Sequence, residues 1–135
     1  EVVASAPVRS RFVTAYDLLG REEGIRTLVD RFYALMDELP EAATIRAMHP
    51  EDLTESADKL WMFLVGRFGG PNLYVERHGH PRLRMRHAPF AVDAEAASAW
   101  MVCMNRALDE QVEDPAARKE LKAFFAMVAQ HMRNR

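Results

Sequence analysis

The sequence has little cysteine, no long apolar run and no excess of basic residues. Cys103 is the single cysteine in 135 residues, so no internal disulfide framework forms, and we expect a reducing, cytoplasmic location. No apolar stretch approaches the ~20 residues that cross a bilayer, so we expect no membrane span. The 18 basic and 20 acidic residues leave no basic stripe to neutralise phosphates, which argues against a nucleic-acid partner.

Several motifs of enzyme chemistry are also missing. The chain has no glycine loop that would cradle phosphates and no Gly-x-Ser-x-Gly elbow. Cys103 lacks a paired histidine signal, which disfavours a catalytic thiol. His78 and His80 stand close together, but without a cysteine or carboxylate cluster they fall short of zinc-site spacing. Hydrolase, nucleotide-binding, thiol and zinc functions are therefore disfavoured.

What is present indicates one helical domain. Residues 1–15 include a small, mixed and aperiodic stretch, and we expect a flexible N-terminal arm there, followed by a single domain over 16–135. Residues 16–19 predict one helical turn. Apolar residues recur at spacings of three and four over about 22–39 and 51–68, which predicts two amphipathic helices.

Two further helices are predicted by their caps. Asp93 is a good N-cap for one helix, and Asp114-Pro115 is a cap followed by a first helical residue for the last one. The fold class is therefore all-α. Residues 69–90 hold glycine and proline breaks and three histidines, and their pattern fits either a short edge strand or one turn of helix.

Three side chains stand where aliphatic residues would pack more simply. These are Tyr33, Trp100 and His87. A buried Tyr or Trp is commonly a core group with a satisfied polar tip, and a lone His is more often structural than a ligand, so a cofactor site is the less common interpretation. The residues alone leave both interpretations open.

The sequence resembles the truncated haemoglobins, and within them group II. The stretch over 80–90 (HPRLRMRHAPF), followed by Ala99-Trp100 and Cys103-Met104, carries most of the similarity. It is supported by Tyr16-Asp17-Leu18, by residues 22–25 and 28–33, and by Met62-Phe63-Leu64 leading into Gly69-Gly70-Pro71. The resemblance implies a shortened globin, a two-over-two helical sandwich around haem b. Relatives often carry paired glycines after the first short helix, whereas here Gly20 is followed by Arg21.

The resemblance also implies roles for individual residues. His87 would be the proximal iron ligand, with its second ring nitrogen donating to a backbone carbonyl or a carboxylate. Tyr33, His49 and Trp100 would be hydrogen-bond donors that stabilise a ligand on the distal face. Other pocket residues would be Phe32, Ser56, Leu60 and Phe63. The haem itself would contact Lys59, Arg86, Arg84, Phe90 and Met104, with the basic residues on its propionates.

The expected function is binding of oxygen and other diatomic ligands (carbon monoxide, nitric oxide) for capture, sensing, transport or delivery. The alternative is a redox haem enzyme that converts nitric oxide to nitrate or reduces peroxide, with His49 as the distal base and a reductase as possible partner. A third possibility is a cofactor-free helical interaction module. We expect a monomer or homodimer.

Overall fold

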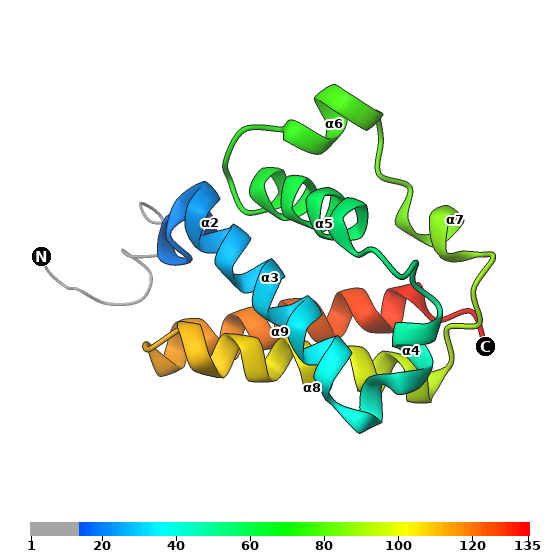
Figure 1. Cartoon of the computed structure of the whole chain (residues 1–135). Coiled ribbons are helices and arrows are strands. Elements are labelled where there is room, and N and C mark those ends of the chain that lie inside the picture. Colours follow the sequence, from blue (N-terminus) through cyan, green and yellow to red (C-terminus); the bar gives the residue numbers. More distant parts are fainter. Residues whose placement is uncertain (1–13) are drawn as a thin grey trace, which may run out of the picture.

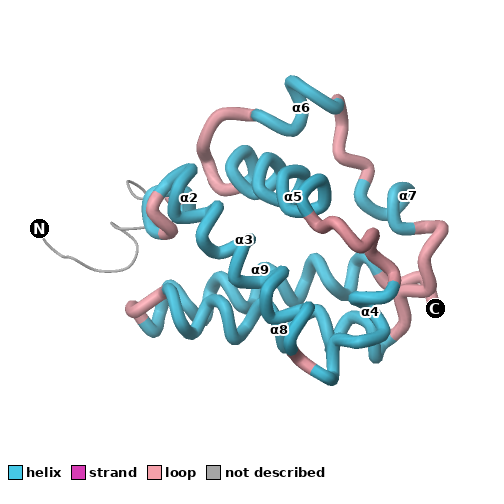
Figure 2. The backbone as a smooth tube through the Cα atoms, viewed as in Figure 1, coloured by secondary structure: helices cyan, strands magenta, loops and turns pink. Residues whose placement is uncertain are grey.

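The computed structural model describes residues 14–135, and within this range every regular element is helical. The elements, shown in Figures 1 and 2, are α2 (Ala15–Leu18), α3 (Arg21–Glu38), the 3-10 turn η1 (Pro40–Ala42), α4 (Ala43–Ala47), α5 (Thr54–Arg67), α6 (Leu73–His78), α7 (Leu83–His87), α8 (Ala94–Gln111) and α9 (Pro115–Met132). The all-α prediction is confirmed. The ambiguous region over 69–90 contains α6 and α7 and no strand.

The N-terminal arm predicted over residues 1–15 lies almost entirely outside the described residues. Thr14 and Ala15 are described: Thr14 is the N-cap of α2, and Ala15 is the first residue of that helix. The Thr14 side chain accepts a hydrogen bond from the backbone N–H of Asp17, so it caps α2. None of the helices described in residues 14–135 is long and apolar enough to span a membrane.

The two long C-terminal helices begin at the predicted caps. The Asp93 carboxylate accepts from the Ala96 N–H at 2.8 Å, which satisfies one free donor in the first turn of α8. Asp114 accepts from the Ala116 N–H at 3.3 Å, and Pro115 takes the first position of α9, where a missing N–H costs nothing. Both boundaries therefore follow from local side-chain chemistry.

The helices form two layers (Figure 1). The antiparallel pair α8 and α9 forms one layer. The other layer contains α3, which crosses α8, and α5, which packs against α3. The short helix α6 packs on α5, while α7 packs on α9. The core between the layers contains large side chains with at most 1% exposure, among them Ile25, Leu28, Phe32, Leu35, Met36, Leu64, Met104, Leu108 and Phe125.

The corner between α2 and α3 depends on close backbone contact. Gly20 and Arg21 both have positive φ, 94° and 63°, so Arg21 adopts the conformation that a second glycine would adopt without strain. Gly24 follows one turn later, and a Cβ on it would stand 1.7 Å from the Leu19 carbonyl oxygen. Glycine at position 24 is therefore a steric requirement of this corner.

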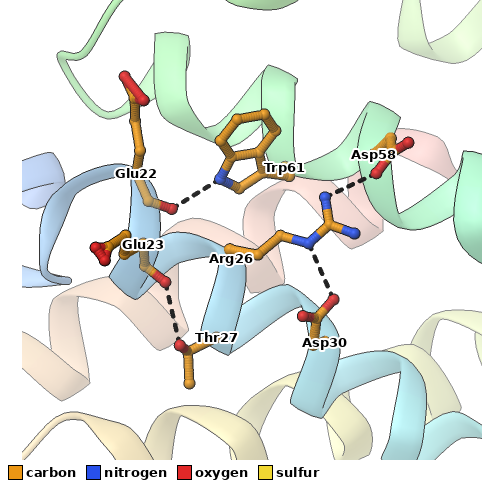
Figure 3. Close-up of polar contacts among 7 residues, drawn as sticks. All are labelled: Glu22, Glu23, Arg26, Thr27, Asp30, Asp58 and Trp61. Carbon is orange, nitrogen blue, oxygen red and sulfur yellow. Dashed lines mark hydrogen bonds and ion pairs between the residues drawn. The ribbon is translucent and has the colours of Figure 1, made fainter.

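Polar contacts fix α5 on α3 (Figure 3). The Arg26 guanidinium donates to Asp58 on α5 at 2.7 Å and to Asp30 on its own helix at 3.1 Å. The indole N–H of Trp61 donates to the Glu22 carbonyl oxygen at 2.8 Å. Trp61 thus has a satisfied polar tip and a role in the fold.

Candidate functional site

The structure brings the three predicted distal residues into one aromatic cluster. Phe32 lies at its centre, with its ring centroid 4.9 Å from that of Tyr33 and 4.9 Å from that of Trp100. The Tyr33 ring stands edge-on to the ring of His49, with centroids 5.9 Å apart. Side chains from α3, from α8 and from the segment after α4 therefore meet, although 67 residues separate Tyr33 from Trp100 along the chain.

Two polar tips of this cluster, those of Tyr33 and Trp100, have no protein partner among the described residues. Neither the Tyr33 hydroxyl nor the Trp100 indole N–H makes a hydrogen bond to any described residue, whereas the N–H of Trp61 does. Tyr33 is 9% exposed, and burial raises the pKa of its phenol to about 12. Tyr33 therefore keeps its proton at neutral pH and offers an unused O–H.

His49 has its tautomer set by the backbone. Its Nδ1 lies 2.8 Å from the Ile45 carbonyl oxygen, and because a carbonyl can only accept, the proton of the neutral ring is on Nδ1. Nε2 then carries a lone pair. The expected N–H donor at His49 is thus available at Nε2 only when the ring is doubly protonated, and the neutral ring is an acceptor there.

Arg46 holds the segment that follows His49. Its guanidinium donates to Asp37 at 2.8 Å, to the Pro50 carbonyl at 3.0 Å and to the Glu51 carbonyl at 2.9 Å. Three bonds from one side chain tie the segment after α4 to α3. Sequence patterns did not indicate this role, because these partners are brought together by the η1–α4 turn, which was not predicted.

His87 ends α7 and is half-buried. Its Nδ1 lies 2.7 Å from the Leu83 carbonyl oxygen, which identifies the acceptor that the sequence left open between a carbonyl and a carboxylate. The proton of the neutral ring is therefore on Nδ1, and Nε2 carries a free lone pair. No described residue bonds to Nε2. This is the arrangement expected of a histidine that ligates a metal through Nε2.

The remaining pocket candidates divide by exposure. Ser56, Leu60 and Phe63 lie three and four residues apart on α5, hence on one helix face, and all three are half-buried. Phe90 is 41% exposed. The other two candidates, Phe32 and Met104, have no accessible surface and belong to the core.

The three basic candidates have different surroundings. Lys59 forms an ion pair with Glu55 at 3.3 Å on the exposed side of α5. The Arg86 guanidinium donates to the Pro81 carbonyl at 2.6 Å and lies 5.8 Å from the centroid of the Tyr74 ring. Arg84 donates to the His131 carbonyl on α9 at 2.8 Å. Each guanidinium keeps further N–H groups for an anion.

The described part of the chain shows neither a reactive thiol nor a metal site built from His, Cys, Asp and Glu side chains. Cys103 is fully buried, and burial raises the pKa of its thiol, which disfavours the reactive thiolate. No group of three or more His, Cys, Asp or Glu side chains that could hold a metal ion occurs among residues 14–135. Surface hollows of about 520 and 260 Å³ include His49 and Lys59, respectively, in their lining and contain none of Tyr33, His87 and Trp100.

Comparison with known proteins agrees with this arrangement. The family described as bacterial-like globin matches residues 14–134. Group 2 truncated hemoglobin YjbI of Bacillus subtilis is 41% identical over 123 residues, which are 91% of this chain and 90% of that protein. The structure of a group II 2-on-2 hemoglobin from Agrobacterium tumefaciens superposes with a TM-score of 0.87 at 44% identity, covering 93% of this chain and 97% of that chain.

A third comparison involves the truncated oxygen-avid haemoglobin from Bacillus subtilis, with a TM-score of 0.81 at 40% identity over 90% of this chain and 99% of that one. The chain belongs to the truncated (2-on-2) haemoglobin family, group II, of the bacterial-like globins. It is therefore a haem-binding protein of a family that binds diatomic gases. The residues fit that group, because His87 offers an unpaired Nε2 and Phe90, Leu60 and Phe63 leave apolar surface accessible.

Proposed function

We propose that the chain binds haem b through Nε2 of His87 and holds oxygen or another diatomic ligand beside the cluster of Tyr33, Trp100 and His49. When bound, the haem would supply an iron atom that takes the gas. Tyr33 and Trp100 would each donate a hydrogen bond to the ligand. His87 would be kept in one tautomer by the Leu83 carbonyl.

The unpaired polar tips of the aromatic cluster carry this proposal. Neither the O–H of Tyr33 nor the N–H of Trp100 is fully enclosed by protein atoms, so both stay accessible to a ligand that can accept a hydrogen bond from them. Trp61 shows that the same chain satisfies an indole N–H where the indole is structural. Donors left free in this way support a ligand site.

The donors would act mainly on the rate at which the ligand escapes. A hydrogen bond contributes about 1 kcal/mol net, which corresponds to a factor of about five in an equilibrium constant. Two donors would together slow escape by roughly one to two orders of magnitude. Such retention suits capture, sensing or chemistry on the ligand better than rapid release, and the relative from Bacillus subtilis described as oxygen-avid is consistent with it.

The proposed axial bond is tested by His87→Gly. The purified protein is supplied with haem, and absorption spectra are recorded for the ferric, ferrous and carbon monoxide forms. We expect the wild type to show histidine-ligated iron and the variant to lose that signature, with added imidazole restoring it. A variant whose spectra match those of the wild type would remove His87 from the site.

The proposed distal donors are tested by Tyr33→Phe, which removes one oxygen atom and keeps the ring. We expect oxygen to dissociate about five times faster or more from the variant, since one donor of about 1 kcal/mol is lost. The matched control is Tyr16→Phe, because Tyr16 lies on α2, outside the cluster. Equal rates in wild type and Tyr33→Phe would exclude the donor role.

A second candidate function is redox detoxification, and the tautomer of His49 favours it. Reduction of peroxide needs a distal base that takes a proton, and the lone pair on Nε2 of neutral His49 can serve as that base. The test is the peroxidase rate of His49→Ala, which we expect to fall. An unchanged rate would remove the peroxidase role. Turnover of nitric oxide to nitrate would need a reductase as partner, and we propose one on that ground.

The cellular setting follows from the chain's own features. The one cysteine is buried and unpaired, which is compatible with a reducing cytoplasm. We propose a cytoplasmic protein, acting as a monomer or homodimer, with 16–135 as its domain. Size measurement of the haem-loaded protein in solution distinguishes the two oligomeric states.

A further inference from the structure

The segment from His87 to Val92, called here the proximal segment, is bonded to the C-terminal end of the chain. The Asn134 backbone N–H donates to the Val92 carbonyl at 2.9 Å, and the Val92 N–H donates to the Asn134 side-chain oxygen at 3.0 Å. The Asn134 side-chain N–H₂ donates to the Phe90 carbonyl at 2.9 Å and, at 3.4 Å, to the carbonyl of His87 itself.

The orientation of the Asn134 amide is set by its partners. Val92 N–H can only donate, so the amide oxygen must face it, and the amide nitrogen then faces the two carbonyls. Oxygen and nitrogen positions are therefore mutually consistent, and all four bonds form together. A second tie lies nearby, where Arg84 on α7 donates to the His131 carbonyl near the end of α9.

The proximal segment has little else to hold it. Ala88, Pro89, Phe90 and Ala91 are exposed, and α7 has five residues, too few for a stable isolated helix. The packing of α7 is on α9. The position of the His87 backbone therefore depends on bonds to the C-terminal end of α9 and to Asn134, which follows that helix.

From this geometry we infer that Asn134 is a positioning residue for the proximal histidine. It touches neither ligand nor reacting atoms, and it acts by fixing the carbonyls of His87 and Phe90 so that the imidazole stays aimed in one direction. The inference rests on the proposed function of His87 as the iron ligand. It adds a dependence of that bond on Asn134.

The test compares Asn134→Leu with the wild type in the haem-loaded protein. One measurement is the rate of haem transfer to an excess of a haem-scavenging apoprotein, and the other is the iron–histidine stretching band of the ferrous form. We expect haem loss to be about five- to thirtyfold faster, as removal of one or two net hydrogen bonds predicts, and the stretching band to shift or broaden.

Two further variants separate positioning from general stability. Arg118→Ala removes a bond of similar length, to the Val112 carbonyl at 2.9 Å, together with an ion pair to Asp109 at 3.5 Å, at the opposite end of α9. It is expected to lower the thermal midpoint and leave the stretching band unchanged. Asn134→Asp keeps an oxygen for the Val92 N–H but loses the amide donor, so it is expected to behave like Asn134→Leu.

The outcomes are distinguishable. If the wild type shows no histidine-ligated iron, the proposed function fails. If it does, and Asn134→Leu leaves both haem loss and the stretching band unchanged, this inference is overturned while the proposed function stands. A shifted band in Arg118→Ala, or wild-type behaviour of Asn134→Asp, would equally overturn a role for the amide donor.

Discussion

The rings of Tyr33 and His49 stand edge to face at 73°, with centroids 5.9 Å apart. Tyr33 offers a hydroxyl proton, and neutral His49 offers a lone pair at Nε2, because its Nδ1 proton is given to the Ile45 carbonyl. The two residues are therefore complementary in chemistry, one a donor and the other an acceptor. A diatomic ligand beside them would meet both kinds of group.

The titration of Tyr33 is a direct check of its burial. Its phenol pKa is raised by burial from 10.0 to about 12, so the folded state holds the proton more tightly than the unfolded state. The stabilisation is present below pH 10 and is lost as pH rises from about 10 to 12, by roughly 2–3 kcal/mol in the free energy of unfolding. We expect one late tyrosine in a near-ultraviolet absorbance titration, absent in Tyr33→Phe.

Replacement by Phe should change a different property at each of the two tryptophans: stability at Trp61 and ligand release at Trp100. Trp61→Phe removes the bond to the Glu22 carbonyl and leaves that carbonyl with one partner fewer, so we expect a loss of about 1 kcal/mol in the free energy of unfolding. Trp100→Phe removes an N–H that has no protein partner, so ligand dissociation should accelerate about fivefold or more. Denaturant unfolding and ligand-release kinetics on both variants check this, and a reversed pattern would contradict it.

Arg46 should influence ligands through His49. Arg46→Met removes three hydrogen bonds to Asp37, Pro50 and Glu51 and keeps an unbranched apolar stem. We expect the segment after α4 to loosen and ligand kinetics to move toward those of His49→Ala.

The double variant Arg46→Met with His49→Ala provides the control. If Arg46 acts through His49, the double variant should match His49→Ala, giving a coupling energy equal to the Arg46 effect. Additive effects on ligand kinetics would show that Arg46 acts by another route.

Two substitutions at the α2–α3 corner should change the free energy of unfolding in opposite directions. Arg21→Gly should raise the free energy of unfolding by up to about 1 kcal/mol, since glycine adopts positive φ without strain and the lost ion pair with Asp17 is exposed. Gly24→Ala should lower it by several kcal/mol, because a Cβ would overlap the Leu19 carbonyl. Thermal unfolding of both variants measures this. A neutral Gly24→Ala would mean that the corner relaxes freely.

The predictions from local patterns were largely confirmed. Period-3.6 spacing indicated α3 and α5, and the cap residues Asp93 and Asp114 indicated where α8 and α9 begin, because a cap acts within one turn of chain. The region over 69–90 stayed ambiguous, since helices as short as α6 and α7 contain too few residues to show a period. The η1–α4 turn was missed for the same reason.

The group II resemblance named His87, Tyr33, Trp100 and His49 from their residue types and order along the chain, before any contact was known. Which nitrogen of His49 carries the proton, which carbonyl His87 uses, and which tryptophan keeps a free N–H all depend on atoms brought close by folding. So do the bonds of Asn134, whose partners lie more than 40 residues away. Spacing along a helix reports neighbours within a few turns, whereas hydrogen bonds between distant segments form only once the layers have packed.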